Sequence, residues 1–288
     1  MSNLSTIPPV PTGNLAGGVT LLPVQKITEE AAPIRMNDPV AVEEPLEISL
    51  EYGQGAARRQ QNVSVTMRTP GQDTDLAVGF LFTEGILPDA AAVLSVTADA
   101  NSIKISLREG ISPDIGRLQR HFYTSSSCGV CGKSSIDALR TVVPAAAAVK
   151  EGPPVEAQVL HGLPPMLRQE QSIFETTGGL HAAALFDRAG MILSLREDIG
   201  RHNAVDKLIG RALQDDLLPL TNNILLLSGR ACFELIQKAA MAGIKIIAAI
   251  GPPSSLAVQM AQESDITLVG FLREQRFNIY SGAHRIRI

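Results

Sequence analysis

Cysteine is scarce in this sequence, which has three among its 288 residues. Small secreted proteins held together by disulfides carry far more cysteine, and usually an even number of them. The low, odd count therefore excludes a disulfide-stapled scaffold and favours a protein of a reducing compartment. A chain of this length can bury a core large enough to fold without such crosslinks.

The sequence also lacks a surplus of positive charge and any long apolar run. Its 25 Lys and Arg residues stand against 29 Asp and Glu residues, a formal net charge of −4. This balance argues against nucleic acid or an anionic membrane as a partner through the overall field, although it leaves a local basic pocket open. No window approaches the roughly 20 apolar residues of a membrane helix, and the N-terminus has no signal-peptide pattern. We expect a soluble, cytoplasmic protein.

The first half of the chain predicts a small α+β unit preceded by a tail. Residues 1–20 are rich in proline and glycine and are expected to be disordered. Residues 21–145 alternate apolar and polar positions in a way that predicts strands, with one helical stripe between them. Residues 142–158, rich in alanine and proline, are expected to connect this antiparallel unit to the second half. The predicted elements are a strand pair at 44–52 and 62–67, a helix capped by Asp73 or Thr74, and a hairpin at 93–97 and 102–107.

Residues 146–288 predict a different architecture, in which strands alternate with helices. Short apolar runs here are typical of strands that are buried on both faces of a sheet. Gly243 stands where the C-terminus of a helix favours glycine, directly before the third of these strands. We therefore expect an α/β domain with strands at 191–196, 223–228, 244–250 and 267–272, and with helical faces at 205–213, 235–239 and 256–261.

The loops that leave these strands carry arginine, serine and histidine. Ligands of open α/β sheets bind beyond the carboxyl ends of the strands, so the loops should converge on one crevice. Serine and glycine at a strand-to-helix turn present backbone N–H groups to an anion, and arginine grips phosphate oxygens. We expect a phosphate-bearing ligand there, the alternative being residues that only cap helices and face water. The candidates are Arg201, Arg230, Ser254, Ser255, Arg273 and Arg276.

Two common nucleotide-binding motifs are missing. The sequence contains neither a Walker A motif nor a GxGxxG motif. Their glycines are what allow a backbone to cradle phosphates in P-loop and dinucleotide-binding proteins. An ordinary ATPase or a dinucleotide-dependent dehydrogenase is therefore not supported.

The densest chemistry lies in the segment SCGVCGK, residues 127–133. The thiols of Cys128 and Cys131 can reach each other or share a ligand, and Lys133 beside a helix N-terminus should lower a thiol pKa. A structural zinc site normally needs a second ligand pair, and the sequence has no other cysteine pair and no His-x₃₋₅-His. A thioredoxin-like pair would follow the first strand of a compact βαβ unit. A third interpretation is a sulfur carrier, in which one thiol holds a persulfide and the other releases it.

The remaining cysteine and two histidines have competing interpretations. Cys232 shares a predicted helical face with Leu235 and Ile236, which favours a core residue. His181 is flanked by glycines and small residues, which would let a ligand or the Cys-x-x-Cys loop come close; the alternative is a half-buried histidine with satisfied hydrogen bonds. His202 stands at the predicted start of a helix, where a capping or phosphate-binding role is favoured over that of a general base.

Taken together, these segments resemble the FdhD family, the sulfur carrier proteins that serve formate dehydrogenase. The resemblance runs from about Ala41 to Tyr280 and is carried by SCGVCGK, TGGLHAAAL, REDIGRHNAVDKLIGRAL, SGRACFELIQKAAMAGI, PPSSLAV and TLVGFLREQRFNIY. It implies a cytidine-deaminase-like α/β fold for the larger domain, with a mixed sheet flanked by helices. It also implies sulfur transfer from a cysteine desulfurase, through the Cys-x-x-Cys motif, to the molybdenum bis(molybdopterin guanine dinucleotide) cofactor before its insertion into the formate dehydrogenase apoenzyme.

The resemblance also assigns residues to this activity. It places the persulfide on Cys128, and we expect Cys131 to assist the transfer. The resemblance places cofactor binding on Phe271, Leu272, Arg273, Glu274, Gln275 and Arg276. The loop argument adds Arg201, Arg230, Ser254 and Ser255, together with His181. The cofactor is expected as a bound substrate, and no resident metal is expected.

Two alternatives to sulfur transfer follow from the same residues. A zinc nucleobase deaminase needs His-x-Glu followed by a Cys-x-x-Cys pair. Here His181 is followed by Ala182 and Ala183, and the Cys-x-x-Cys pair precedes it, so the sequence argues against deamination. The second alternative is a non-catalytic chaperone that holds the cofactor or the apoenzyme. As partners we expect the desulfurase, the apoenzyme, guanine nucleotide moieties and a second copy in a homodimer, and neither nucleic acid nor membrane.

Overall fold

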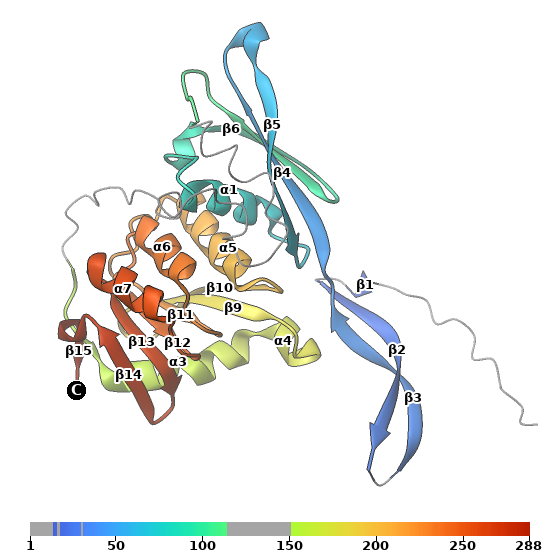
Figure 1. The fold of residues 1–288 in the computed structure, drawn as a ribbon, viewed down its shortest axis with the longest axis vertical. Helices are drawn as coiled ribbons and strands as arrows, with labels where there is room; N and C mark the ends of the chain where they lie inside the picture. Colours follow the sequence, from blue (N-terminus) through green and yellow to red (C-terminus); the bar gives the residue numbers. More distant parts are fainter. Residues whose placement is uncertain (1–13, 16–17, 30, 114–150) are drawn as a thin grey trace, which may run out of the picture.

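The computed structural model describes residues 14–15, 18–29, 31–113 and 151–288 of the chain. A six-stranded sheet with helices on both faces forms the larger part, and the N-terminal strands extend away from it (Figure 1). The expected α/β class, with a mixed sheet flanked by helices, is confirmed. Among the described residues, no helix is both long enough and apolar enough to cross a membrane.

The six-stranded sheet has the order β10-β9-β11-β12-β13-β14. All four strands expected in this half are present, and β9 and β14 were not predicted. β11, β12 and β13 are mutually parallel, whereas β9 is antiparallel to both of its neighbours and β14 is antiparallel to β13. The bounds are β9 (His181–Phe186), β10 (Ile192–Asp198), β11 (Ile224–Leu227), β12 (Ile246–Ala249), β13 (Thr267–Arg273) and β14 (Arg276–Ser281).

Helices cover both faces of this sheet because alternate residues of its strands point to opposite sides. Leu225 and Leu227 join the hydrophobic cluster that contains the side chains of α5, α6 and α7, whereas Ile224 and Leu226 join the cluster of α3. Both faces of β11 are therefore buried against apolar side chains, which explains why its sequence is a continuous apolar run. The helices are α3 (Ala157–Glu170), α4 (Ser172–Thr177), α5 (Arg201–Gln214), α6 (Phe233–Met241) and α7 (Ser255–Glu263).

The expected connector at 142–158 extends too far. Residues 142–150 lie outside the described residues, but a short strand, β8 (Val155–Glu156), and then α3 begin inside the rest of it. β8 pairs with β15 (Ile286–Arg287) at the C-terminal end of the chain. The predictions missed α3 because it contains two prolines, Pro164 and Pro165.

The N-terminal unit contains the expected strand pair, helix and hairpin. Its sheet, however, is not purely antiparallel: β4 and β7 are parallel, with Ile48 beside Ile103 and Leu50 beside Ile105. Parallel neighbours need a crossover connection. The chain from β4 to β7 passes through β5, α1 and β6, with α1 between β5 and β6. The sheet order is β5-β4-β7-β6, with β4 (Glu44–Tyr52), β5 (Arg59–Arg68), α1 (Asp73–Thr83), β6 (Val93–Asp99) and β7 (Ser102–Leu107).

The start of α1 differs from the expectation. Neither Asp73 nor Thr74 is its capping residue. Gln72 precedes the helix in the left-handed region with φ of 54°, and it makes no side-chain capping bond. The acidic side chains of Asp73 and Asp75 instead lie in the first turn, where the helix dipole favours negative charge.

The helices α1 and α5 cross at two glycines. A Cβ atom on Gly79 would lie 1.9 Å from the carbonyl oxygen of Asp206, and one on Gly210 would lie 1.9 Å from that of Asp75. No side chain fits at such distances, so this close approach requires glycine on both helices. Through this contact the N-terminal unit and the larger sheet share one hydrophobic core.

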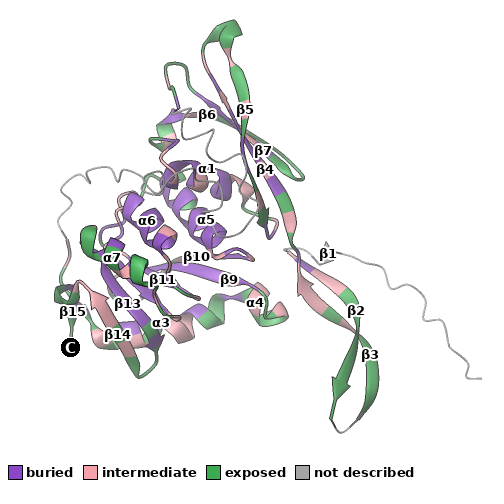
Figure 2. Cartoon of the chain, in the orientation of Figure 1, coloured by how far each residue is buried: buried purple, intermediate pink, exposed green. Residues whose placement is uncertain are grey.

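A β hairpin of β2 (Val19–Thr28) and β3 (Ala31–Ala41) extends from the body of the protein, together with β1 (Asn14–Leu15). Figure 2 shows that most of it is exposed. Several of its exposed side chains are large and apolar: Leu22, Val24, Ile27, Ile34 and Met36. The expected tail, residues 1–20, lies for the most part outside the described residues, and β1 and the first residues of β2 fall within it.

Candidate functional site

Four strands bring their carboxyl ends to one edge of the larger sheet. β10 and β11 point the same way because both are antiparallel to β9, and β12 and β13 are parallel to β11. β9 begins at this edge, where His181 is the partner of Asp198. The predicted convergence of the loops is confirmed, and the unpredicted strand β9 adds His181 to them.

The acidic residues at the end of β10 maintain the architecture of this edge. Glu197 accepts hydrogen bonds from the backbone N–H groups of Ile173 and Phe174, at 3.1 and 2.9 Å, and so fixes the start of α4. Asp198 is fully buried and lies 2.7 Å from the ammonium of Lys207. Burial raises the pKa of Asp198, and Lys207 opposes that shift. Both carboxylates are thus engaged within the protein.

A pocket of about 730 Å³ opens at the same edge. Its walls come from α3, α4, the start of β9 and the segments that follow β11, β12 and β13 (Figure 1). The volume lies within the range of about 300–1,000 Å³ that is usual for small-molecule sites. Residues that line it include Arg168, Gln171, Phe174, His181, Ser228 and Glu274.

His181 lies half-buried at the pocket wall. A Cβ atom on Gly229 would lie 3.3 Å from its Nδ1, so the glycine leaves room for the ring. Burial lowers the pKa of His181, and the positive charges of Arg201 and Arg230 lower it further, while Asp198 raises it. The imidazole is therefore neutral at neutral pH and can both donate and accept a hydrogen bond.

Two residues of the pocket were missed by the sequence analysis. Gln171, between α3 and α4, is 4% exposed, and its Nε2 has no hydrogen-bond partner among the described residues. The guanidinium of Arg168 lies 4.5 Å from the ring centre of Phe174. The available signal was the helical spacing of the apolar residues of α3, which are Leu160, Leu163 and Leu167.

Two of the four predicted loop arginines, Arg201 and Arg230, follow strands that end at this edge. Arg201 is the first residue of α5 and is half-buried, and its Nε has no partner among the described residues. Arg230 is exposed in the loop after β11. The positive charges of both arginines lower the pKa of His181. This edge of the sheet therefore carries two arginines although the chain is acidic overall.

The two predicted serines are at the start of α7. The hydroxyl oxygen of Ser254 accepts a hydrogen bond from the backbone N–H of Ala257 at 3.2 Å, which is an ordinary N-cap. Ser255 is exposed in the first turn of the helix. For Ser254, the structure therefore supports the alternative of helix capping.

The end of β13 has an unusual backbone at Phe271. This residue has φ of 54°, a left-handed conformation that non-glycine residues rarely adopt, and its side chain is 41% exposed. Its N–H donates to the carbonyl oxygen of Gly251 at 3.1 Å. The side chain of Leu272, by contrast, is completely buried in the core. We correct its expected role accordingly: Leu272 packs the fold and its side chain cannot touch a ligand.

Arg273 ends β13, Glu274 and Gln275 form the turn, and Arg276 begins β14. The guanidinium of Arg273 donates to the carbonyl oxygens of Ile250 and Leu272, both at 2.7 Å, and so ties β13 to the end of β12. Glu274 lines the pocket. Gln275 and Arg276 are exposed. The stretch thus borders the pocket at Glu274.

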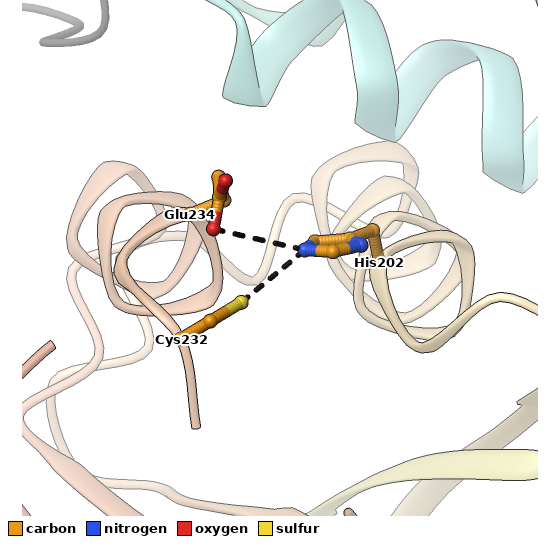
Figure 3. A group of neighbouring side chains, drawn as sticks. All are labelled: His202, Cys232 and Glu234. Atoms are coloured by element: carbon orange, nitrogen blue, oxygen red, sulfur yellow. Dashed lines mark hydrogen bonds and ion pairs between the residues drawn. The ribbon is translucent and has the colours of Figure 1, made fainter. Parts of the chain in front are cut away.

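His202 and Cys232 lie against each other, a contact that neither expectation included. Cys232 is the N-cap residue of α6 and is partly exposed, so it is not an interior core residue, although it packs against the core. Its Sγ lies 3.3 Å from the Nε2 of His202 (Figure 3). His202 is buried in α5, and the N-cap position of that helix belongs to Gly200, so the capping role is wrong. Burial and then the charge of Glu234 raise the pKa of Cys232.

The predicted sulfur-carrying residues cannot be placed in this geometry. Cys128, Cys131 and Lys133 lie within residues 114–150, outside the described residues. Their roles stay predictions.

Comparison with known proteins gives the family. The model of the FdhD/NarQ family matches residues 41–287. The chain belongs to the FdhD/NarQ family. The resemblance inferred from the sequence segments is confirmed.

Curated relatives of this FdhD/NarQ protein match along most of their length. The sulfur carrier protein FdhD of Streptomyces avermitilis is 47% identical over 284 residues, which cover 91% of this chain and 97% of the relative. The protein of the same name from Mycolicibacterium paratuberculosis is 50% identical over 257 residues, covering 86% and 91%. That of Saccharolobus solfataricus is 39% identical over 250 residues, covering 87% and 91%.

A solved structure shares the fold. It is a crystal structure from Desulfotalea psychrophila, named for a formate dehydrogenase accessory protein. It matches with a TM-score of 0.72 and 22% identity, covering 94% of this chain and all of the other. At this identity the likeness concerns the fold alone.

Proposed function

We propose that this protein is a cytoplasmic sulfur carrier that serves formate dehydrogenase. In this proposal Cys128 receives sulfur from a cysteine desulfurase, and the molybdenum bis(molybdopterin guanine dinucleotide) cofactor is the substrate that accepts it. The names of the curated relatives support the carrier role. The observation in the structure that supports it best is the pocket of about 730 Å³ at the sheet edge, beside His181 and two arginines.

The first step is an exchange at sulfur. The Cys128 thiolate attacks the outer sulfur of a persulfide on the desulfurase, and a new S–S bond forms on Cys128 while the old S–S bond breaks. The electron pair of the broken bond leaves with the desulfurase cysteine as its thiolate. The step moves one sulfur atom without a net change of oxidation state, so it needs no oxidant.

The second step releases the sulfur. The Cys131 thiolate attacks the inner sulfur of the Cys128 persulfide, which forms a disulfide between the two cysteines and expels hydrosulfide to the molybdenum centre. The two electrons that reduce the outer sulfur come from the thiols, so a cellular dithiol reductant must later reduce the disulfide. Two cysteines at Cys-x-x-Cys spacing suit this release.

The cofactor is anionic because it carries pyrophosphate groups, and the sheet edge suits one of its nucleotide halves. Arg201 and Arg230 supply positive charge, and arginine is well suited to phosphate. The Nε2 of Gln171, which has no partner among the described residues, and the neutral ring of His181 offer hydrogen bonds to a base or ribose. The exposed ring of Phe271 at the same edge offers a surface for stacking. Arg201 and Arg230 follow the carboxyl ends of β10 and β11, His181 begins β9 at the same edge, and Gln171 lies between α3 and α4.

Mass spectrometry tests the carrier role. The purified chain is incubated with desulfurase and cysteine, and the mass of the peptide that contains Cys128 is measured. We expect a gain of one sulfur atom in the native chain and in Cys232→Ala, the matched control, and none in Cys128→Ala. A formate dehydrogenase that remains fully active in cells with only Cys128→Ala would overturn the proposal.

The same measurement separates the non-catalytic chaperone. A chaperone would bind guanosine 5′-diphosphate and support the dehydrogenase, but it would carry no additional sulfur on the Cys-x-x-Cys peptide. We expect Arg230→Gln to weaken binding of this nucleotide while sulfur loading of Cys128 is retained. Sulfur loading of Cys128 and binding of the nucleotide are thus measured independently.

We also propose a homodimer. The exposed apolar side chains of the β2–β3 hairpin suit burial against a second copy, since large exposed apolar patches usually mark interaction surfaces. Light scattering on the native chain should give twice the chain mass, and Ile34→Lys with Met36→Lys should give the monomer. A monomeric native chain at micromolar concentration would refute this part.

A further inference from the structure

Three side chains with metal-binding atoms meet where α5 and α6 begin. His202 comes from the first turn of α5, Cys232 precedes α6, and Glu234 lies in its first turn (Figure 3). The Nε2 of His202 lies 3.3 Å from the Sγ of Cys232 and 3.9 Å from the Oε2 of Glu234. The three ligand atoms all lie within 4.8 Å of one another.

These separations are close to those in a zinc site. Bond lengths of about 2.0 Å to nitrogen, 2.3 Å to sulfur and 2.1 Å to oxygen, in a tetrahedron, hold the ligand atoms about 3.3–3.6 Å apart. The contact between His202 and Cys232 already meets this requirement. Glu234, whose side chain is 16% exposed, would move inward by up to about an ångström.

The charge of the cluster also suits a divalent cation. A thiolate and a carboxylate together carry two negative charges, which balance a doubly charged ion. This balance is needed because the positive ends of two helices and the nearby charge of Arg201 disfavour an unneutralised cation. The cluster is largely buried, and a neutral ion–ligand group is what a partly buried site tolerates.

We propose that His202, Cys232 and Glu234 bind one divalent cation of the zinc class, separately from the Cys-x-x-Cys motif. Binding releases the thiol proton of Cys232 to solvent, so that sulfur binds as the thiolate. Three protein ligands leave a fourth position for water or a small ligand, as in many zinc sites. Imidazole and thiolate together favour zinc or cobalt over magnesium or calcium.

The site lies beside the pocket of the proposed function but does not depend on it. His202 lies in the first turn of α5 after β10, and Cys232 precedes α6 after β11, so the cluster lies at the same edge of the sheet as the pocket. A bound cation would join the N-terminus of α5 to that of α6. Arg201 is the first residue of α5, and Arg230 lies in the loop before α6.

Metal titration tests the site on the full chain with Cys128→Ala and Cys131→Ala, which removes the other two thiols. Zinc chloride is titrated after chelation, and bound zinc is counted after gel filtration. Cobalt chloride is the spectroscopic probe, because a cobalt–thiolate bond gives a charge-transfer band in the near ultraviolet. We expect one zinc ion per chain and this band with cobalt.

Single changes on the same background locate the ligands. We expect Cys232→Ser to abolish the cobalt–thiolate band and Glu234→Gln to weaken zinc binding by at least about tenfold, since even outer-shell changes cost this much. His161→Gln, a histidine elsewhere in the fold, is the matched control and should bind as the background chain does. Circular dichroism shows that each variant is folded.

Two outcomes would overturn the proposal. One is a folded background chain that binds no zinc at a hundredfold excess over protein. The other is zinc binding that Cys232→Ser and Glu234→Gln leave unchanged. In either case the three residues form only a hydrogen-bonded contact between helices. Neither outcome affects sulfur loading of Cys128, so failure of this site and failure of the carrier role are read separately.

Discussion

Lys238 of α6 places its ammonium 2.9 Å from the Oδ1 of Asp206 in α5, and both side chains are almost completely buried. The hydroxyl of Thr83, at the end of α1, lies 2.7 Å from the same carboxylate oxygen and 2.9 Å from the ammonium. Burial by itself lowers the pKa of Lys238, but Asp206 and Glu84 raise it above its ordinary value. A charged cluster thus joins α1, α5 and α6.

Removing one partner of this cluster should be costly. Lys238→Met leaves the Asp206 carboxylate buried without its cation, and we expect a loss of about 3–5 kcal/mol in the free energy of unfolding, measured with urea. Arg211→Gln is the matched control, because Arg211 pairs with Asp215 on the exposed side of α5 and should contribute less than about 1 kcal/mol. Equal losses in the two variants would contradict the buried role.

The glycine crossing of α1 and α5 gives a second stability prediction. Gly79→Ala adds a methyl group where a carbonyl oxygen lies 1.9 Å away, so the helices must separate, and we expect a loss of about 3 kcal/mol or more. Gly162→Ala in α3 is the matched control, because no atom lies within 4 Å of its Cβ position, and alanine should stabilise that helix by up to about 1 kcal/mol. Thermal unfolding of both variants checks the opposite signs.

The sequence allowed the parallel strands to be predicted more readily than the segments around them. A strand buried on both faces must be apolar throughout, so β11 and β12 stand out as short runs between loops. β9 begins with His181 and three alanines, a pattern that does not distinguish strand from helix. Its place between β10 and β11 depends on long-range pairing, as does the parallel contact of β4 with β7.

The candidate site was predictable only in part for a similar reason. Parallel topology alone brings the strand ends together, so Arg201 and Arg230 could be placed at one edge before the structure was known. Gln171 faces the pocket because α3 packs across that edge, which no local pattern encodes. The contact between His202 and Cys232 joins two helices and two residues 30 positions apart. Such relations arise from packing.

The protonation of His181 predicts the direction in which the stability of the fold changes with pH. Its pKa lies below the ordinary value of 6.5, because burial and then Arg201 disfavour the charged ring. Between the folded pKa and about 6.5, the unfolded chain binds more protons, so stability falls as the pH decreases through this window. NMR titration should give a midpoint below 6.5 for His181, and a higher midpoint in Arg230→Gln.

A variant without the imidazole, His181→Asn, is the control for this pH dependence of stability. In His181→Asn the part of the loss of stability below about pH 6.5 that comes from this ring should disappear. A midpoint above 6.5 in the native chain would contradict the assigned environment. A midpoint that Arg230→Gln leaves unchanged would show that its charge is too far from the ring to act.

Replacing Gln171 should affect nucleotide binding and the free energy of unfolding differently. Its Nε2 is buried without a partner among the described residues, so Gln171→Leu removes a donor that these residues leave unsatisfied, and we expect unchanged or slightly higher stability. If the amide serves a bound nucleotide, the same change should weaken binding of guanosine 5′-diphosphate by about two- to tenfold, the value of one hydrogen bond. Calorimetric titration and urea unfolding measure the two effects.

Gln259→Leu is the matched control for this separation, because Gln259 is an exposed residue of α7 whose amide bonds to Glu263. It should leave nucleotide binding unchanged. Weaker binding in Gln171→Leu together with full stability would mean that the amide is kept for a ligand, since an unpaired buried donor otherwise only costs free energy. Unchanged binding with a loss of more than about 1 kcal/mol in stability would instead make Gln171 a packing residue between α3 and α4.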